Sequence, residues 1–408
     1  MRRKNEIVLI GAGKIGKAYV AEVFDNAGYD ITFIGRSPQG IQLLKKQGYY
    51  TVHLSYPNGQ KKMRRIDGYE AFSYLVEREK CIDRLLEVDL ACVQIYPDGV
   101  NDAVDLLAEA IMQRADAAID RPLNVMFCVN FVLPSRMFRA RIAKQMHTEK
   151  HIRYFDSKIG FVDGLPKRGV YAPTEQMLCD DPLALNANVF EEVIPVGKTF
   201  VGPLPDTKAL RFVDHAEGLI VQKIWCGNMA SSMLGALGFV LKQAIYMDEA
   251  AQDSYIRFIV DGAREEACRA VQAEYEFTEE EMQPVKNANW AALMQPGARD
   301  TVKRQANDPI RKLAKNERFT GPGLLCIKHG GIPVFLARGA AAIFLYDNKE
   351  DEKAVALQQY IKEYGIDNAI EEHCQLDMKQ TDEVLWKQLI MKQYADLDAL
   401  RRRKCKSS

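Results

Sequence analysis

Residues 7–16 read IVLIGAGKIG, in which four apolar residues are followed by glycines at positions 11, 13 and 16. A helical pattern of apolar residues follows in KAYVAEVFDNAG (17–28), and a second apolar run, ITFI, occupies 31–34. A strand-like run, a glycine cluster, a helix and another strand-like run in this order are typical of a βαβ unit with parallel strands. The stretch therefore predicts that the chain opens with a parallel α/β domain.

The glycines have the spacing G-x-G-x-x-G directly after a strand and at the start of a helix. Gly11 permits the tight turn, Gly13 lets the backbone approach a pyrophosphate, and Gly16 allows close packing of helix on strand. Backbone N–H groups at the start of the helix bind the anion. We therefore expect a dinucleotide at this turn, and the alternative is a structural glycine turn. The expected binding residues are Gly11, Ala12, Gly13, Lys14, Ile15 and Gly16.

The end of the second strand indicates which dinucleotide binds. An acidic residue usually stands there to bind the ribose hydroxyl of NAD, but this chain has Arg36 and Ser37 after ITFIG. An Arg pairs with a 2′-phosphate, and a Ser hydroxyl donates to it. NADP(H) is therefore the expected cofactor, and the alternative is NAD with Arg36 as a solvated surface residue.

Apolar runs at 88–95 and 123–131, separated by a helical pattern at 101–115, continue the alternation of strand and helix. A doubly wound, Rossmann-type α/β domain explains this order. Beyond about residue 205 the strand-like runs end, and 217–247 and 253–275 have the apolar spacing of helices. We expect a dinucleotide-binding domain over 1–195, a mainly α-helical substrate domain over 196–395 and a frayed basic tail over 396–408.

The charge and cysteine content limit the classes of partner. The 408 residues include 55 Lys+Arg and 55 Asp+Glu, so no global field attracts nucleic acid or an anionic membrane. The nine cysteines are scattered, odd in number and never form a CxxC pair, a pattern that favours free thiols in the cytoplasm over disulfides or a metal site. The four apolar residues near the amino terminus are too few for a secretory core or a membrane span.

Several longer motifs occur in a fixed order along nearly the whole chain. They are GAGKIG at 11, CVNF at 128, KIGFVDGLPKRGVYAP at 158, KIWCGN at 223 and DPIRKLAKNERFTGP at 308. In these the chain resembles the long-chain polyol dehydrogenase family, most closely its mannitol-1-phosphate 5-dehydrogenase branch. The resemblance implies an amino-terminal Rossmann domain, a carboxy-terminal helical domain and a substrate between them.

The family carries its chemistry on one helix in a Lys, Asn, His arrangement, with the Lys as general base. The chain has Lys223 and Asn228 at the first two positions and Ser231 where the family has His. On an α-helix the three side chains lie within an arc of roughly 140°, and a Ser still donates a hydrogen bond. From the pattern alone, Lys223 in its apolar stretch is either a snorkelling surface residue or a buried amine with a lowered pKa.

The resemblance also implies roles for residues of the first domain. In CVNF, Val129 stands where related enzymes commonly have an acidic residue, and Asn130 remains a candidate cofactor or substrate contact or a turn-forming Asn. Asp163 and Arg168 match positions that line the substrate cleft. A structural salt bridge is the alternative for each of these two residues.

The segment RKLAKNER gathers four basic residues in the second domain. Arg311 and Arg318 match the family motif and are candidates to bind a phosphate or carboxylate, Arg311 as a bidentate fork. The alternative for all four residues is a solvated helix face, which is the usual explanation of a charge run and which fits Lys312 and Lys315 better than anion binding.

The leading hypothesis is an NAD(P)-dependent oxidoreductase that interconverts a secondary alcohol and a ketone on a polyol, a sugar acid or their phosphates. Lys223 takes the hydroxyl proton, while Asn228 and Ser231 stabilise the alkoxide. The alternatives are a redox-neutral epimerase or isomerase that retains its nicotinamide, and a catalytically silent relative. We expect a small-molecule substrate, and a monomer or homodimer.

Overall fold

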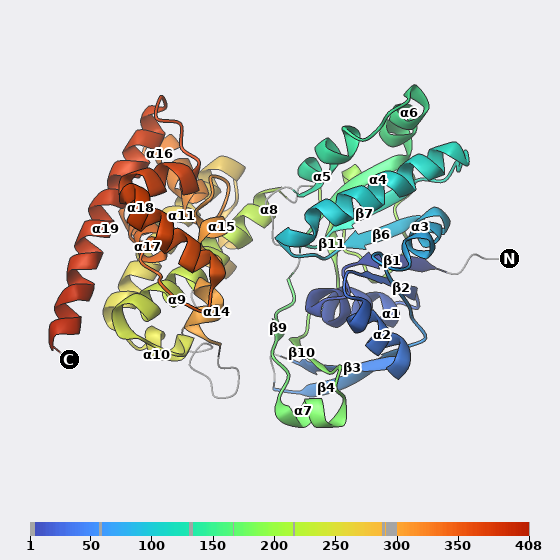
Figure 1. Cartoon of the computed structure of the whole chain (residues 1–408), viewed down its shortest axis with the longest axis horizontal. Helices are drawn as coiled ribbons and strands as arrows, with labels where there is room; N and C mark the ends of the chain where they lie inside the picture. The colour runs from blue at the N-terminus through green and yellow to red at the C-terminus, as the bar shows by residue number, and fades with distance from the viewer. Residues whose placement is uncertain are drawn as a thin grey trace. The chain divides into compact units, whose positions relative to one another are not determined.

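The computed structural model describes residues 5–56, 59–129, 134–165, 167–214, 217–287, 290 and 300–407, with side chains up to residue 403. The chain forms two compact units, Met1–Glu217 and Gly218–Ser408. The first unit is built on a parallel sheet and the second is helical, which confirms the expected fold class (Figure 1).

A seven-stranded sheet forms the centre of the first unit, in the order β11-β8-β7-β6-β1-β2-β5. All neighbouring strands are parallel except β11, which pairs antiparallel with β8. The strands are β1 (Glu6–Ile10), β2 (Asp30–Gly35), β5 (Glu70–Ser73), β6 (Leu90–Val93), β7 (Leu123–Phe127), β8 (Ile159–Leu165) and β11 (Ile194–Pro195). Leaving β11 aside, this is the order 3-2-1-4-5-6 of dinucleotide-binding sheets, whose chain order reverses between β1 and β6. A ligand of such a sheet binds outside the carboxyl ends of these two strands.

Both faces of this sheet are buried. Along β1, Ile7 and Leu9 enter one apolar core, while Val8 and Ile10 enter the other, because successive side chains of a strand point to opposite faces. The described helices of the unit are η1 (Gly16–Ala21), α1 (Glu22–Asn26), α2 (Pro38–Gln47), α3 (Arg78–Glu87), η2 (Pro97–Gly99), α4 (Val100–Asp116), α5 (Pro134–Ala143), α6 (Glu149–Lys158), α7 (Glu175–Asp180) and η3 (Gly197–Thr199).

A second, four-stranded sheet was not anticipated from the sequence. Its order is β4-β3-β10-β9. The strands are β3 (Tyr49–Ser55), β4 (Lys61–Asp67), β9 (Val170–Tyr171) and β10 (Leu185–Asn188). Because β10 pairs with β3 from more than 130 residues away, no local pattern could reveal the pairing.

The regular elements of the second unit are helices, in the part of the unit that the structure describes. Its helices are α8 (Glu217–Val221), η4 (Gln222–Asn228), α9 (Met229–Lys242), α10 (Met247–Ala251), α11 (Ser254–Tyr275), α12 (Glu279–Lys286), α14 (Val302–Ala306), α15 (Pro309–Leu313), α16 (Thr320–Lys328), α17 (Val334–Phe344), α18 (Glu352–Cys374) and α19 (Thr381–Ser407). The stretch Glu217–Lys242 is long and apolar enough to cross a membrane, with a mean hydropathy of 1.4, but 72% of its most apolar window is buried in the protein. A core helix explains that composition.

The first unit extends to Glu217, beyond the boundary expected at residue 195. Bridges join Val193 to Leu210 and Val196 to Val213, so the segment after β11 folds back on the first unit. The segment expected to be a frayed basic tail is instead helical, because α19 continues to Ser407, and Leu397 in it is fully buried. The guanidinium of Arg401 lies 3.2 Å from the Asp347 carboxylate, so this part of the expected tail is anchored.

Candidate active site

The glycine turn after β1 lies at the chain-order reversal of the main sheet. Gly11 has φ +121°, and a Cβ there would lie 2.0 Å from the carbonyl oxygen of Gln94 at the end of β6. A Cβ on Gly16 would lie 2.2 Å from the carbonyl oxygen of Gly11. Neither position has room for a side chain, so both glycines are needed for the turn itself.

Gly13 differs from Gly11 and Gly16, because a Cβ there would have no heavy atom of the described residues within 4 Å. The residue is exposed, as is Lys14, while Ala12 and Ile15 are half-buried. No internal contact therefore explains a glycine at position 13. Open space beside a turn at the carboxyl end of β1 is what the approach of a pyrophosphate requires. The residues present fit a dinucleotide at this place.

Gln94 is a residue of this site that the sequence analysis missed. It follows β6, its backbone N–H donates to the Ile10 carbonyl at 2.8 Å, and its side chain is buried. Among the described residues, its amide oxygen and amide nitrogen have only the Cys92 thiol, a weak hydrogen-bond partner, within reach. Buried amides are normally paired, so an unpaired one beside the glycine turn indicates a missing partner. Only the tertiary fold brings position 94 to this turn.

The structure places Arg36 and Ser37 after β2, as expected, but both have partners in the protein. Arg36 Nη1 donates to Asp98 Oδ2 at 3.1 Å, and Arg36 Nε lies 3.6 Å from Asp102 Oδ2. Ser37 caps α2 by accepting from the backbone N–H of Gly40 at 3.1 Å. Two carboxylates therefore offset the charge of Arg36.

Asp163 lies on β8 and orders the start of α5. Its carboxylate accepts the backbone N–H of Ser135 at 2.9 Å and the Ser135 hydroxyl at 2.6 Å. Burial raises the pKa of Asp163, and these hydrogen bonds oppose that rise. Asn130 lies outside the described residues.

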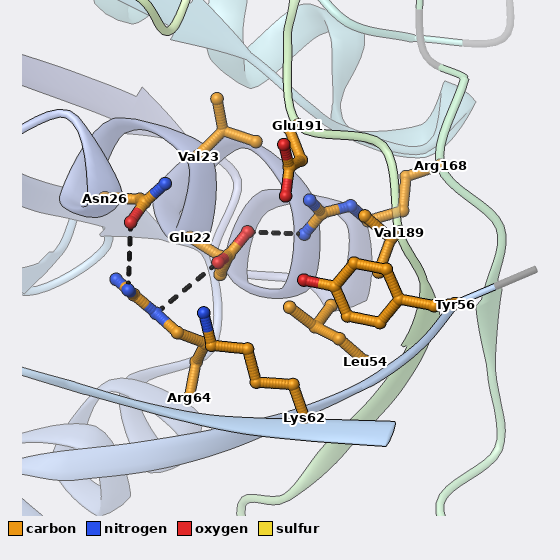
Figure 2. A pocket seen from close by; sticks show the side chains of 10 residues that line it. All are labelled: Glu22, Val23, Asn26, Leu54, Tyr56, Lys62, Arg64, Arg168, Val189 and Glu191. Atoms are coloured by element: carbon orange, nitrogen blue, oxygen red, sulfur yellow. Dashed lines mark hydrogen bonds and ion pairs between the residues drawn. The ribbon is translucent and has the colours of Figure 1, made fainter. Parts of the chain in front are cut away.

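Arg168 is fully enclosed in the first unit, and Figure 2 shows its guanidinium against Glu22. Its Nη1 donates to the Glu22 carboxylate at 2.8 Å and to the Ala18 carbonyl at 2.7 Å, while Nη2 donates to the Phe190 carbonyl at 2.6 Å. The structural salt bridge, which the sequence left as the alternative, describes these contacts. We therefore propose no substrate contact for Arg168.

In the second unit, Lys223, Asn228 and Ser231 lie on one continuous helical segment formed by η4 and α9. All three are half-buried, whereas Ile224 and Cys226 on the same segment are buried. The segment η4 is a π-helix, in which the Met229 N–H donates to the Ile224 carbonyl five residues back.

The π-helix changes the geometry that the sequence suggested. Since its hydrogen bonds span five residues and not four, each turn holds more residues than an α-helical turn, and Lys223 and Asn228 lie nearer in angle than on the α-helix assumed from the sequence. Such π-helical turns occur frequently at functional sites. The Ser231 hydroxyl donates a long hydrogen bond of 3.4 Å to the Gly227 carbonyl of its own helix, so its proton is only weakly engaged.

The basic segment after α14 adjoins the same helix. Arg318 is buried and donates through Nη1 to the Ser232 hydroxyl at 2.9 Å. Burial lowers the pKa of Arg318 to about 10. Arg311 lies instead against Asp308, at 2.7 Å, and Glu317, at 3.5 Å. Its fork is therefore already occupied by carboxylates of the protein.

Comparison with known proteins places both units in one family. The sequence model of the mannitol dehydrogenase Rossmann domain matches residues 5–207, and that of the mannitol dehydrogenase C-terminal domain matches residues 217–400. Mannitol-1-phosphate 5-dehydrogenase of Geobacillus stearothermophilus is 29% identical over 91% of this chain and 95% of its own length. The Anoxybacillus flavithermus enzyme of the same name is 27% identical over 90% and 95%.

Two solved structures share the architecture along almost the whole chain. The Pseudomonas fluorescens mannitol 2-dehydrogenase, in ternary complex with NAD and D-mannitol, has a TM-score of 0.76 at 16% identity, covering 100% of this chain and 95% of its own. A substrate-free D-sorbitol dehydrogenase has a TM-score of 0.72 at 15% identity, covering 98% and 94%. At this identity the likeness concerns the fold.

Proposed function

The chain belongs to the mannitol dehydrogenase family, and from this premise we propose that it is a nicotinamide-dependent oxidoreductase acting on a polyol or a polyol phosphate. The reaction interconverts a secondary alcohol and a ketone. The curated relatives act as mannitol-1-phosphate 5-dehydrogenases, and they extend over nine-tenths of the chain. The observation that carries the proposal is the open position at Gly13, on a turn at the chain-order reversal of the sheet.

The residues that would hold the dinucleotide are those of the turn at 11–16, with the start of the helix that follows. Bound there, the nicotinamide supplies hydride transfer. Apart from the weak Cys92 thiol, the Gln94 amide beside the turn has no hydrogen-bond partner among the described residues, and we propose that it contributes to holding the dinucleotide. We propose no direct contact of Asp163 with the cofactor or the substrate. Its carboxylate positions the start of α5 through its hydrogen bonds with Ser135.

Lys223 is the proposed general base on the catalytic helix. Its place one π-helical turn from Asn228 lets both side chains address one substrate oxygen, the amine to accept the hydroxyl proton and the amide to donate a hydrogen bond. Ser231 contributes a further hydrogen-bond donor to the substrate oxygen when its hydroxyl turns away from the Gly227 carbonyl. The present hydrogen bond to that carbonyl is already long. A neutral hydroxyl there supplies less stabilisation of an alkoxide than the imidazole of the family.

The preference between NADP and NAD depends on whether Arg36 binds the 2′-phosphate or stays with its carboxylate partners, Asp98 and Asp102. The guanidinium supports the expected 2′-phosphate binding, but Asp98 and Asp102 hold it and repel an added dianion. We propose that the enzyme prefers NADP(H) to NAD(H). Because two carboxylates already hold Arg36, this preference is smaller than an unpaired arginine would give.

We propose that the enzyme acts in the cytoplasm as a monomer or homodimer on small-molecule substrates. The eight cysteines with described side chains are unbonded thiols, and seven of them are buried, an arrangement suited to a reducing compartment. Light scattering after gel filtration tests the state of assembly.

A spectrophotometric screen at 340 nm tests the proposed function. Polyols, ketoses, aldonic and uronic acids and their phosphates are offered with NAD(H) and with NADP(H), and nucleotide turnover is compared with product formed. Stoichiometric consumption of nucleotide is the expected result. A substrate converted without net nucleotide consumption would indicate an epimerase or isomerase, and binding without conversion would indicate a silent relative.

A further inference from the structure

Residues 308–318 of the second unit bring three cations and two carboxylates into one cluster, in which Lys312 and Arg318 are buried and the other three residues are half-buried. Arg311 is engaged by both carboxylates, at 2.7 Å from Asp308 and 3.5 Å from Glu317. Asp308 in addition caps α15, because it accepts the backbone N–H of Arg311. The arginine that the sequence favoured for anion binding is thus already neutralised.

Lys312 is in the opposite situation. Its residue surface is 3% exposed, and its amine has no hydrogen bond or ion pair with any residue that the structure describes. An unpaired charge in such a place is costly, so lysines are almost never buried without a partner. Burial, together with Arg318 and Arg311, holds the pKa of Lys312 well below its usual range. The amine therefore needs an acceptor that the described residues do not provide.

Arg318 shows the same shortage of acceptors. Its Nη1 is bonded to Ser232, but its buried Nε has no hydrogen-bond partner in the part of the chain that the structure describes, and the Glu317 carboxylate lies 3.8 Å away. The Glu317 oxygen of this long ion pair is also buried, and among the described residues it accepts no hydrogen bond. A lysine amine offers three donors and an arginine Nε offers one, so donors without partners outnumber that single acceptor. A ligand that satisfies the cluster must therefore be rich in acceptor oxygens.

The cluster is attached to the proposed catalytic helix. Arg318 bonds Ser232, the neighbour of Ser231. The Trp225 indole N–H donates to the Asn316 carbonyl at 3.3 Å, and a Cβ on Gly321 would lie 2.5 Å from the Trp225 ring. The loop that follows α15 thus packs directly on the helix that carries Lys223.

We propose that Lys312, with Arg318 as a second donor, binds an anionic oxygen group of the substrate, a phosphate or a carboxylate. The inference rests on the proposed function and specifies which side chain selects charged over neutral polyols. A phosphate or carboxylate oxygen accepts from both nitrogens, and its charge stabilises the ammonium of Lys312. Lys312, and not Arg311, is then the specificity-determining residue of the segment.

Lys312→Met is the decisive variant because it nearly keeps the length of the side chain while removing the amine. Lys315→Met is the matched control, since Lys315 is on the same loop, partly exposed and paired with Glu383 at 2.6 Å. The probes are D-mannitol 1-phosphate, D-gluconate and D-mannitol. In Lys312→Met we expect KM to rise tenfold or more for the anionic probe that is a substrate and to change less than threefold for D-mannitol. The probe that responds distinguishes phosphate from carboxylate.

Equal changes for charged and neutral probes, or an equal effect of Lys315→Met, would overturn the proposal. A second readout does not depend on turnover: inorganic phosphate, added with NADH present, should raise the melting temperature of the wild type and not that of Lys312→Met. An unchanged phosphate response in the variant would contradict the assignment even if no polyol is oxidised. Should Lys312→Met not fold, Lys312→Gln is the substitute, with the same expected loss.

Discussion

Replacing Gly13 by alanine should weaken dinucleotide binding while leaving the fold intact. In the described structure a Cβ at this position meets no heavy atom within 4 Å, and the backbone φ of Gly13 lies outside the left-handed region. An alanine therefore fits the unliganded protein without strain, and it reduces the freedom of the unfolded chain. Such a change stabilises by about 0.4 to 1 kcal/mol.

The melting temperature should accordingly stay constant or rise by up to about 4 °C, since 1 kcal/mol corresponds to roughly 2 to 4 °C in a unit of this size. Binding should respond differently, because the added methyl group occupies the open space through which a pyrophosphate reaches the backbone N–H groups. The loss of one charge-assisted hydrogen bond costs about 1.5 to 3 kcal/mol. We therefore expect the Kd for NADH or NADPH to rise roughly 10- to 150-fold.

Fluorescence titration of the nucleotide gives the Kd, and calorimetry gives the melting temperature. Gly16→Ala is the matched control, because its Cβ would lie 2.2 Å from the Gly11 carbonyl. Overpacking costs about 1 to 3 kcal/mol, so this variant should melt roughly 2 to 12 °C lower. If Gly13→Ala binds nucleotide as tightly as the wild type, the turn is not the pyrophosphate site and the reasoning is refuted.

Four further substitutions test individual residues. Lys223→Met should lower kcat by about 100- to 10,000-fold with nucleotide Kd unchanged within a few fold, and near-normal turnover would remove it from the mechanism. Ser231→Ala should lower kcat by about tenfold at most, as a neutral hydrogen bond of about 1 kcal/mol allows; a larger loss in steady-state assays would mean that the hydroxyl does more than donate weakly. Arg36→Ala should reduce the NADPH to NADH ratio of kcat/KM by about tenfold, and an unchanged ratio would exclude Arg36 from cofactor choice. Gln94→Met should weaken NADH binding several-fold in a titration without lowering the melting temperature of the free protein, whereas a destabilised free protein would show that the amide has a structural partner.

The sequence by itself was sufficient for the features that depend on local order. The apolar run, the three glycines and the following helix predicted the βαβ unit at 6–35 correctly, because strand and helix periodicities are visible within a few residues. The resemblance carried by the longer motifs, including KIWCGN at 223, indicated the mannitol dehydrogenase family, which the matches over both units confirm. Lys223, Asn228 and Ser231 could be named from that spacing, and their roles stay predictions.

Only the tertiary structure determines which polar and charged side chains already have a partner in the protein and which remain available to bind a ligand. Arg168 meets Glu22 from 146 residues away, and Gln94 reaches the glycine turn only because β6 pairs with β1. Arg311 and Lys312 are neighbours in the sequence, yet one is paired with carboxylates and the other is buried without a partner among the described residues. Residue type determines what a side chain can bind, but its partners come from elements far apart in the chain, and their approach depends on how the whole unit packs.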